Sequence, residues 1–195
     1  MKLAKTGSSN KNTDVLFFLG RVLLWMPVTF ALWYFVVPGI LTVTALIVDW
    51  LLTMFASHAI EAIKPDGRSI QVLSQFEGYN FNIQAMNYAY SFPFFLALVL
   101  ASPDTILGKI KKYALAIIPL FLIAIWGVAF DAISVLAFRS STEIAQQLHT
   151  TPLIRLFLSL GWQLGKLILP PLVPVILWLY LYRDYAHKLV PKLVK

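Results

Sequence analysis

The sequence predicts an all-α integral membrane protein with about four transmembrane helices, an outer interfacial helix and a short extracytoplasmic β-hairpin. Composition is the first reason, because 59% of the 195 residues are hydrophobic and 13% are charged, whereas soluble domains carry about 25% charged residues. The second reason is a series of apolar runs that are long enough to cross a hydrocarbon layer of about 30 Å. We expect the whole chain, 1–195, to form one membrane domain.

The N-terminal part of the chain contains two apolar runs, which Pro38 and Gly39 separate. The first run, 15–37, is longer than the core of a signal peptide, so we expect an uncleaved first span. The second run, 40–56, fits either another span or a helix that lies along the membrane interface. The distribution of charge decides between these alternatives.

Basic residues outnumber acidic ones in three segments, 1–14, 102–112 and 183–195. Cytoplasmic loops of membrane proteins carry such an excess of Lys and Arg. The three segments lie on one side of the membrane only if a single crossing precedes Ser57. We therefore expect both termini in the cytoplasm and an interfacial or re-entrant helix at 40–56. The basic residues that give the chain its net charge of +7 then face the anionic inner leaflet of the bilayer. We therefore expect no nucleic-acid partner.

Three further apolar runs, 86–101, 113–137 and 158–182, complete the four predicted spans. Each has the length and composition of a helix that crosses a bilayer or most of one. The run 86–101 follows directly on a polar segment, so its outer end is expected at the membrane surface.

That polar segment, 67–84, is predicted to be the hairpin. Polar and apolar residues alternate on both sides of Glu77 and Gly78, a pattern typical of two strands joined by a turn. We expect the apolar side chains of this hairpin to bind a partner: Ile70, Val72, Phe76, Tyr79 and Phe81.

Two charged residues lie inside predicted spans, Asp131 in the third and Lys166 in the fourth. A charge at the centre of a bilayer costs about 2.5–3.5 kcal/mol on insertion scales, so such residues pair with each other or serve a function. One interpretation is a structural ion pair between Asp131 and Lys166. The other is a polar pocket that opens outward at the foot of the hairpin and is lined by Asn87, Asp131, Gln163 and Lys166.

Other kinds of site lack residues of the required type or spacing. The chain has no cysteine, which excludes disulfides, thiolate metal sites and a cysteine nucleophile. His58, His149 and His187 are scattered over separate loops and the C-terminal tail, so we expect no metal site. No cofactor is expected either.

Several apolar stretches resemble the small bacterial proteins called exosortase H-associated membrane proteins. These stretches are distributed over most of the chain and are 21–27, 30–34, 87–98, 125–131 and 163–175. The resemblance implies a bacterial inner-membrane protein whose partner is a membrane protein such as an exosortase.

The order of elements also resembles the exosortase/archaeosortase fold, in which an outer hairpin leads into a span that bears the catalytic cysteine, followed by spans with an arginine and a histidine. In this chain Asn87 stands near the place of the cysteine, the third span has no arginine, and the fourth offers Gln163 and Lys166 instead of a histidine. The resemblance therefore implies a protein without cysteine transpeptidase activity, and we expect no catalytic residues.

These observations together predict a non-enzymatic accessory subunit of an envelope protein-sorting system, which docks a partner or peptide at an outer polar pocket. Two other classes of function stay open. The chain is alternatively a structural or transport subunit of a larger membrane complex, or a membrane enzyme that uses Asp131 as an acid or base.

Overall fold

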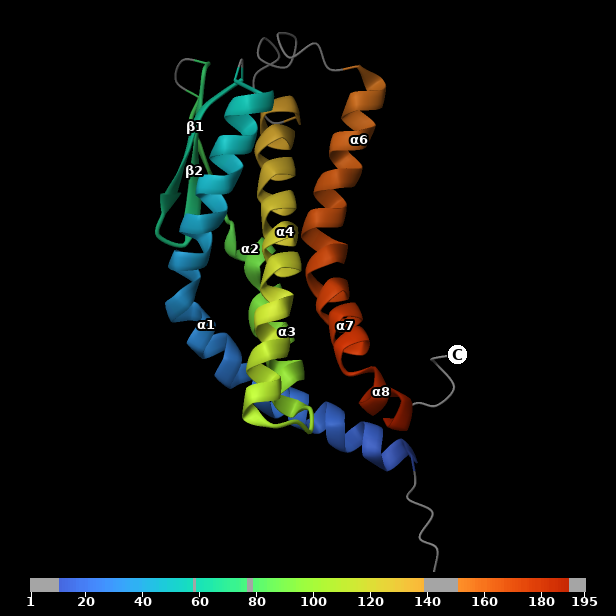
Figure 1. The fold of residues 1–195 in the computed structure, drawn as a ribbon. Coiled ribbons are helices and arrows are strands. Elements are labelled where there is room, and N and C mark those ends of the chain that lie inside the picture. Colours follow the sequence, from blue (N-terminus) through green and yellow to red (C-terminus); the bar gives the residue numbers. More distant parts are fainter. Residues whose placement is uncertain (1–10, 58, 77–78, 139–150, 190–195) are drawn as a thin grey trace, which may run out of the picture.

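Long apolar helices and one small sheet make up the protein in a computed structural model that describes residues 11–57, 59–76, 79–138 and 151–189. The long helices are α1 (Lys11–Phe55), α4 (Ile106–Phe138) and a continuous run made of α6 (Pro152–Gln163), the π-helical segment η1 (Leu164–Ile168) and α7 (Leu169–Leu181) (Figure 1). By length and composition all three runs suffice to cross a membrane. The predicted class is confirmed in part: the structure is mostly helical with a small antiparallel sheet, but three of the four predicted spans, not all four, are long apolar helices.

Shorter helices connect these long elements. The predicted span 86–101 consists of α2 (Met86–Ala89) and α3 (Ser91–Ala101), an apolar run shorter than the other three. The helix α8 (Arg183–Leu189) follows α7 at the C-terminal end. At 1.5 Å per residue the 33 residues of α4 extend over about 50 Å, well beyond a hydrocarbon layer of about 30 Å. This helix therefore has room for both a span and an extension outside the hydrocarbon.

Helix α1 runs without a break through Pro38 and Gly39, so the prediction of a separate helix at 40–56 is wrong. Packing explains the continuity, because one face of this part of α1 is fully buried: Val37, Leu41, Ala45 and Val48 are all 0% exposed. Their spacing of three or four residues forms a stripe along one helix face. Contact along this stripe, chiefly with α3 and β1, outweighs the hydrogen bond that Pro38 removes.

The N-terminal part of α1 takes a different direction from the rest of the helix. Figure 1 shows it crossing the end of the bundle and then bending to run alongside the other helices. Pro27 lies inside the helix, and proline in a helix interior causes such bends because it lacks an N–H and its ring clashes with the preceding turn. The bend brings the first turns of α1 next to α8.

The sheet contains three antiparallel strands in the order β1 (Ile60–Asp66), β2 (Ser69–Ser74) and β3 (Phe81–Ile83). Strands β2 and β3 pair as the predicted hairpin segments do, with Ile70 opposite Ile83; the residues Glu77 and Gly78 between them lie outside the described residues. Strand β1 was not predicted. It joins β2 through a turn in which Gly67 has a φ of +60°, a conformation that favours glycine.

The two edges of the sheet differ in how they are covered. On β1, the backbone N–H of Ile63 donates a hydrogen bond of 2.6 Å to Oδ1 of Asp49 in α1, and Arg68 in the β1–β2 turn lies 3.7 Å from the ring centroid of Tyr34. These contacts hold the β1 side against α1. Strand β3 is the other edge strand and contacts α4.

A glycine contact joins α4 to the α6–η1 run. A Cβ on Gly161 would overlap the ring of Phe130, and a Cβ on Gly165 would come within 2.9 Å of the Cα of Gly127. Glycines four residues apart allow two helix backbones to approach closely, as in many membrane proteins. The indole N–H of Trp126 donates a hydrogen bond of 3.0 Å to the carbonyl of Gly161, which fixes the register of the two helices.

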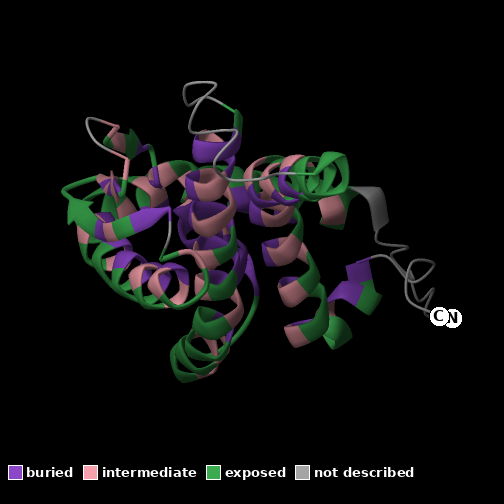
Figure 2. Ribbon diagram, turned by 90° about the horizontal axis from the view of Figure 1, so that it is seen from above, coloured by how far each residue is buried: buried purple, intermediate pink, exposed green. Residues whose placement is uncertain are grey.

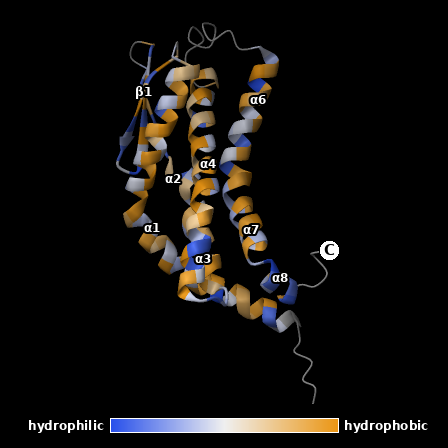
Figure 3. Ribbon diagram, in the orientation of Figure 1, coloured by the Kyte–Doolittle hydropathy of each residue, from blue (hydrophilic) through white to orange (hydrophobic). Residues whose placement is uncertain are grey.

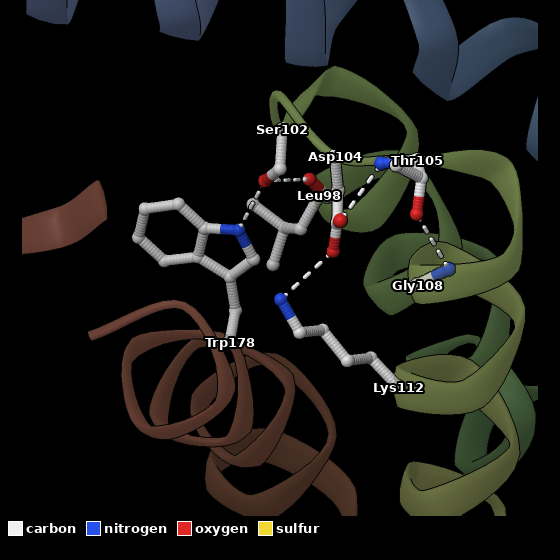
Figure 4. Close-up of polar contacts among 7 residues, drawn as sticks. All are labelled: Leu98, Ser102, Asp104, Thr105, Gly108, Lys112 and Trp178. Atoms are coloured by element: carbon white, nitrogen blue, oxygen red, sulfur yellow. Dashed lines mark hydrogen bonds and ion pairs between the residues drawn. The ribbon is translucent and has the colours of Figure 1, made fainter. Parts of the chain in front are cut away.

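At the end of the bundle opposite the sheet, polar contacts tie α3, α4 and α7 together (Figure 4). The indole N–H of Trp178 donates to Ser102 Oγ over 2.7 Å, and this hydroxyl donates to the carbonyl of Leu98 over 2.8 Å. Lys112 forms an ion pair of 2.8 Å with Asp104. The hydrogen bond from Lys112 holds the pKa of Asp104 below its ordinary value.

Viewed along the bundle, buried residues gather where the helices and the sheet face one another, and the outward helix faces are exposed (Figure 2). Many of these exposed side chains are large and apolar, including Phe35 at 79%, Leu153 at 78% and Phe157 at 60%. Apolar outer faces on long helices are what a lipid environment requires.

Candidate functional site

A cavity of about 300 Å³ lies between the end of β3, helices α2 and α4, and the segment η1. Its lining is mainly polar, in contrast to the apolar faces of the surrounding helices. The lining residues are Asn82, Ile83, Gln84, Asn87, Tyr88, Asp131, Val135 and Lys166.

Strand alternation places two amide side chains at the cavity. Ile83 is 2% exposed and belongs to the hydrophobic core, so its neighbours Asn82 and Gln84 point to the opposite side of the strand. Both are exposed and both line the cavity. Asn82 and Gln84 were missed from the sequence, although the alternation of β3 contained the signal.

Helix α2 begins two residues after Gln84 and supplies the floor of the cavity with Asn87 and Tyr88. Asn87 is exposed there, whereas Tyr88 is 1% exposed and packs against α4. This packing requires glycine at position 127, because a Cβ at that position would overlap the ring of Tyr88. The contact fixes the depth of Asn87 relative to α4.

Asp131 and Lys166 both line this cavity and are both half-buried. No ion pair joins them in the described structure, so the predicted structural pair is wrong. The ammonium of Lys166 instead lies 4.9 Å from the ring centroid of Trp162, within the range of a cation–π contact. One carboxylate and one ammonium are therefore presented to the same space.

Gln163 lies beside a second, smaller cavity of about 170 Å³ between α4 and α6. Asp131 and Val135 line both cavities. The structure thus brings three predicted pocket residues, Asn87, Asp131 and Lys166, around one space and places Gln163 in the space next to it. Their role as a binding site stays a prediction.

Lys166 lies on a π-helical segment. At the end of η1 the N–H of Leu169 donates to the carbonyl of Leu164, five residues earlier. Pro170 and Pro171 follow and lack the N–H groups that would continue an α-helix over Lys166 and Leu167. Such π-segments occur frequently at functional sites.

The apolar side chains of the hairpin that were predicted to bind a partner are buried or partly buried in this structure, and their role in binding stays a prediction. Ile70 and Val72 are 0% exposed, and Phe76, Tyr79 and Phe81 are partly buried against the same core. Alternation shows which side chains share a face of a strand, but it does not show which face is covered. Here the apolar face packs toward the bundle, and the polar face with Asn82 stays accessible.

The described residues contain no group of three side chains of the metal-ligating types in reach of one ion. His58 and His149 lie outside the described residues, and His187 is on α8 at the other end of the bundle from the sheet (Figure 1). The cavity residues offer amide, carboxylate and ammonium groups, which bind by hydrogen bonds and charge.

Comparison with known proteins identifies a family for this chain. A family model described as "Exosortase H-associated membrane protein" matches residues 12–185, a stretch that includes every element of the fold from α1 to α7. No curated protein and no solved structure matches the chain. Because the matched stretch covers most of its length, the chain belongs to the family of exosortase H-associated membrane proteins.

Proposed function

We propose that this protein is a non-enzymatic accessory subunit of the exosortase H system, which holds an extended polypeptide segment of its partner or of a sorted protein. The observation that carries the proposal is the polar cavity beside β3, an edge strand of the sheet. The family description supports association with the exosortase H system.

The amide side chains of the cavity match the chemistry of a peptide backbone. Asn82, Gln84 and Asn87 each carry a carbonyl acceptor and an NH₂ donor, and none of these side chains has a hydrogen-bond partner among the described residues. Each peptide unit presents one N–H and one C=O. A peptide in this cavity exchanges its hydrogen bonds with water for hydrogen bonds with these amides.

The sheet edge supplies the second part of the binding surface. An extended peptide can pair with an exposed edge strand, and its alternate side chains then enter neighbouring pockets. Contacts with α1 hold β1, whereas β3 is the edge that borders the cavity. Asp131 and Lys166 add one charge of each sign, which favours a segment with polar or charged side chains.

The charge distribution supports an outward-facing cavity. Lys109, Lys111 and Lys112 lie in the first turns of α4, and Arg183 and Lys188 lie on α8, all at the end away from the sheet (Figure 1). The excess of basic residues marks the cytoplasmic side. In this orientation the protein is a multi-pass protein of the bacterial inner membrane with cytoplasmic termini, and the cavity faces the exterior.

The absence of cysteine from the sequence supports a binding role rather than cysteine transpeptidation. A docking subunit requires shape, hydrogen-bonding groups and charge at its site but no nucleophile. The cavity meets these requirements.

Co-purification tests this function. Tagged protein is solubilised in mild detergent together with an exosortase from the same cells, and the exosortase recovered is quantified. We expect Asn87→Trp, which fills the cavity from its floor, to reduce recovery about tenfold, equivalent to about 1.4 kcal/mol of binding free energy.

The matched control is Gln75→Trp, an exposed position next to β2 that does not line the cavity. It should leave recovery unchanged. Equal recovery with Asn87→Trp and wild-type protein, or no recovery with the wild type, would overturn the proposal.

A further inference from the structure

A third cavity, of about 300 Å³, lies at the end of the bundle away from the sheet, and its lining is almost entirely apolar. Helix α1 contributes Val15, Phe18, Leu19 and Val22, whose spacing of three and four residues places them on one helix face. Helices α3, α7 and α8 form the other walls. We refer to this space as the α1–α8 groove.

The groove lies where a crosswise helix meets helices that run along the bundle. The N-terminal part of α1 crosses the end of the bundle, and α8 lies beside it (Figure 1). Phe18 stacks on Trp178 of α7 with ring centroids 4.8 Å apart and meets Tyr185 edge-on at 5.8 Å. These ring contacts hold the crosswise part of α1 against α7 and α8 at this end of the bundle.

Two exposed basic residues lie close in sequence to residues that line the groove. Arg21 is exposed one turn after Phe18, and Lys188 is exposed next to Leu189, which lines the groove. Neither forms an ion pair with a described residue. Burial raises the pKa of Tyr185, the charge of Arg21 opposes this rise and the charge of Asp14 adds to it, which places both charged groups near the aromatic cluster. Figure 3 shows α8 as a hydrophilic segment beside apolar helices.

The size of the groove and the basic residues near it select its occupant. A helix from another protein has a diameter of about 10–12 Å with its side chains, too wide for a space of this volume between four helices. A single extended hydrocarbon chain is narrow enough and has no polar groups that would lose hydrogen bonds. The exposed basic residues near the groove complement a phosphate group, and the surface of the cytoplasmic leaflet is anionic.

We propose that the α1–α8 groove binds one acyl chain of an anionic phospholipid, whose headgroup phosphate is held by Arg21 and Lys188. The site is separate from the polar cavity at the other end of the bundle. The bound lipid would connect the N-terminal helix to α7 and α8 at the membrane surface.

Native mass spectrometry of the purified full-length protein tests this site. The probes are phosphatidylglycerol, which is anionic, and phosphatidylcholine, which is zwitterionic, with identical acyl chains. We expect the wild type to retain one phosphatidylglycerol about tenfold better than phosphatidylcholine. The double variant Arg21→Gln, Lys188→Gln should retain both lipids equally.

Filling the groove tests the acyl-chain site itself. Val22→Trp places a large ring in the groove and should abolish retention of both lipids, whereas Leu24→Trp, on the exposed side of the same helix at 74% exposure, should retain them. Ala186→Leu, a smaller change on the α8 wall, serves if Val22→Trp fails to fold. Equal retention of the two lipids by the wild type, or equal lipid loss in the groove and control variants, would overturn the proposal.

Discussion

Replacing Gly161 by leucine is expected to lower the free energy of unfolding by about 3 kcal/mol, the upper part of the range for overpacked interiors. Any side chain at this position overlaps the ring of Phe130 on α4. That ring also stacks on Trp126 with centroids 4.4 Å apart, so it has little room to move. The helices must separate, and the hydrogen bond from Trp126 to the carbonyl of Gly161 is then lost.

Thermal unfolding in detergent measures this loss. The control is Gly20→Leu in α1, where a Cβ has no heavy atom within 4 Å and the melting temperature should stay close to that of the wild type. Similar melting temperatures for Gly161→Leu and Gly20→Leu would contradict close packing of α4 on α6.

Replacing Ile70 by aspartate is expected to have a still larger effect, roughly 4 kcal/mol or more, because it removes a buried apolar side chain and buries a carboxylate without a partner. Ile70 is 0% exposed on the face of β2 that packs in the core. Typical proteins have about 5–15 kcal/mol of stability in total. We therefore expect loss of the monodisperse peak in size-exclusion chromatography.

The neighbouring residue Gln71 provides a control, since its side chain points to the opposite face of the same strand and is only half-buried. Gln71→Asp should shift stability by less than about 0.5 kcal/mol, as surface substitutions usually do. If Ile70→Asp folds as well as Gln71→Asp, the sheet does not pack on the bundle through this face.

Composition and apolar runs predicted the helical class correctly. The predicted division of the first helix at Pro38 and Gly39 was wrong. Pro38 and Gly39 are strong signals for the end of a helix. In the structure they lie inside α1, because the buried stripe that includes Val37 and Leu41 continues across them. Local propensity predicted a break, and tertiary packing overrode it.

Only part of the sheet was predicted, because the rest depends on features that the local sequence pattern does not show. The pairing of β2 with β3 follows from alternation around a turn, whereas β1 includes Pro65 and an irregularity between Ile60 and Ala62, which disturb the alternating pattern. The burial of Ile70 and Val72 depends on which face of the sheet meets the bundle. A single strand does not contain that information.

For the residues of the polar cavity, the position of each residue along its helix could be estimated from the sequence. The direction in which its side chain points around the helix axis could not. Asn87, Asp131 and Lys166 meet at one cavity because each lies at the sheet-facing end of its apolar run. Gln163 was expected on the face of Lys166, three residues away. The π-helical segment begins between them at Leu164 and changes the turn angle, so Gln163 faces the neighbouring cavity.

Site-specific photocrosslinking at Asn82 tests the central claim most directly, because this residue lies on β3 and lines the polar cavity. A benzoylphenylalanine at this position in cells is expected to form a crosslink to the exosortase or to a protein that it sorts. The same group at Lys64, exposed on β1 at the other edge of the sheet, should give little or none. No crosslink from Asn82, or equal crosslinks from both positions, would contradict docking at the cavity.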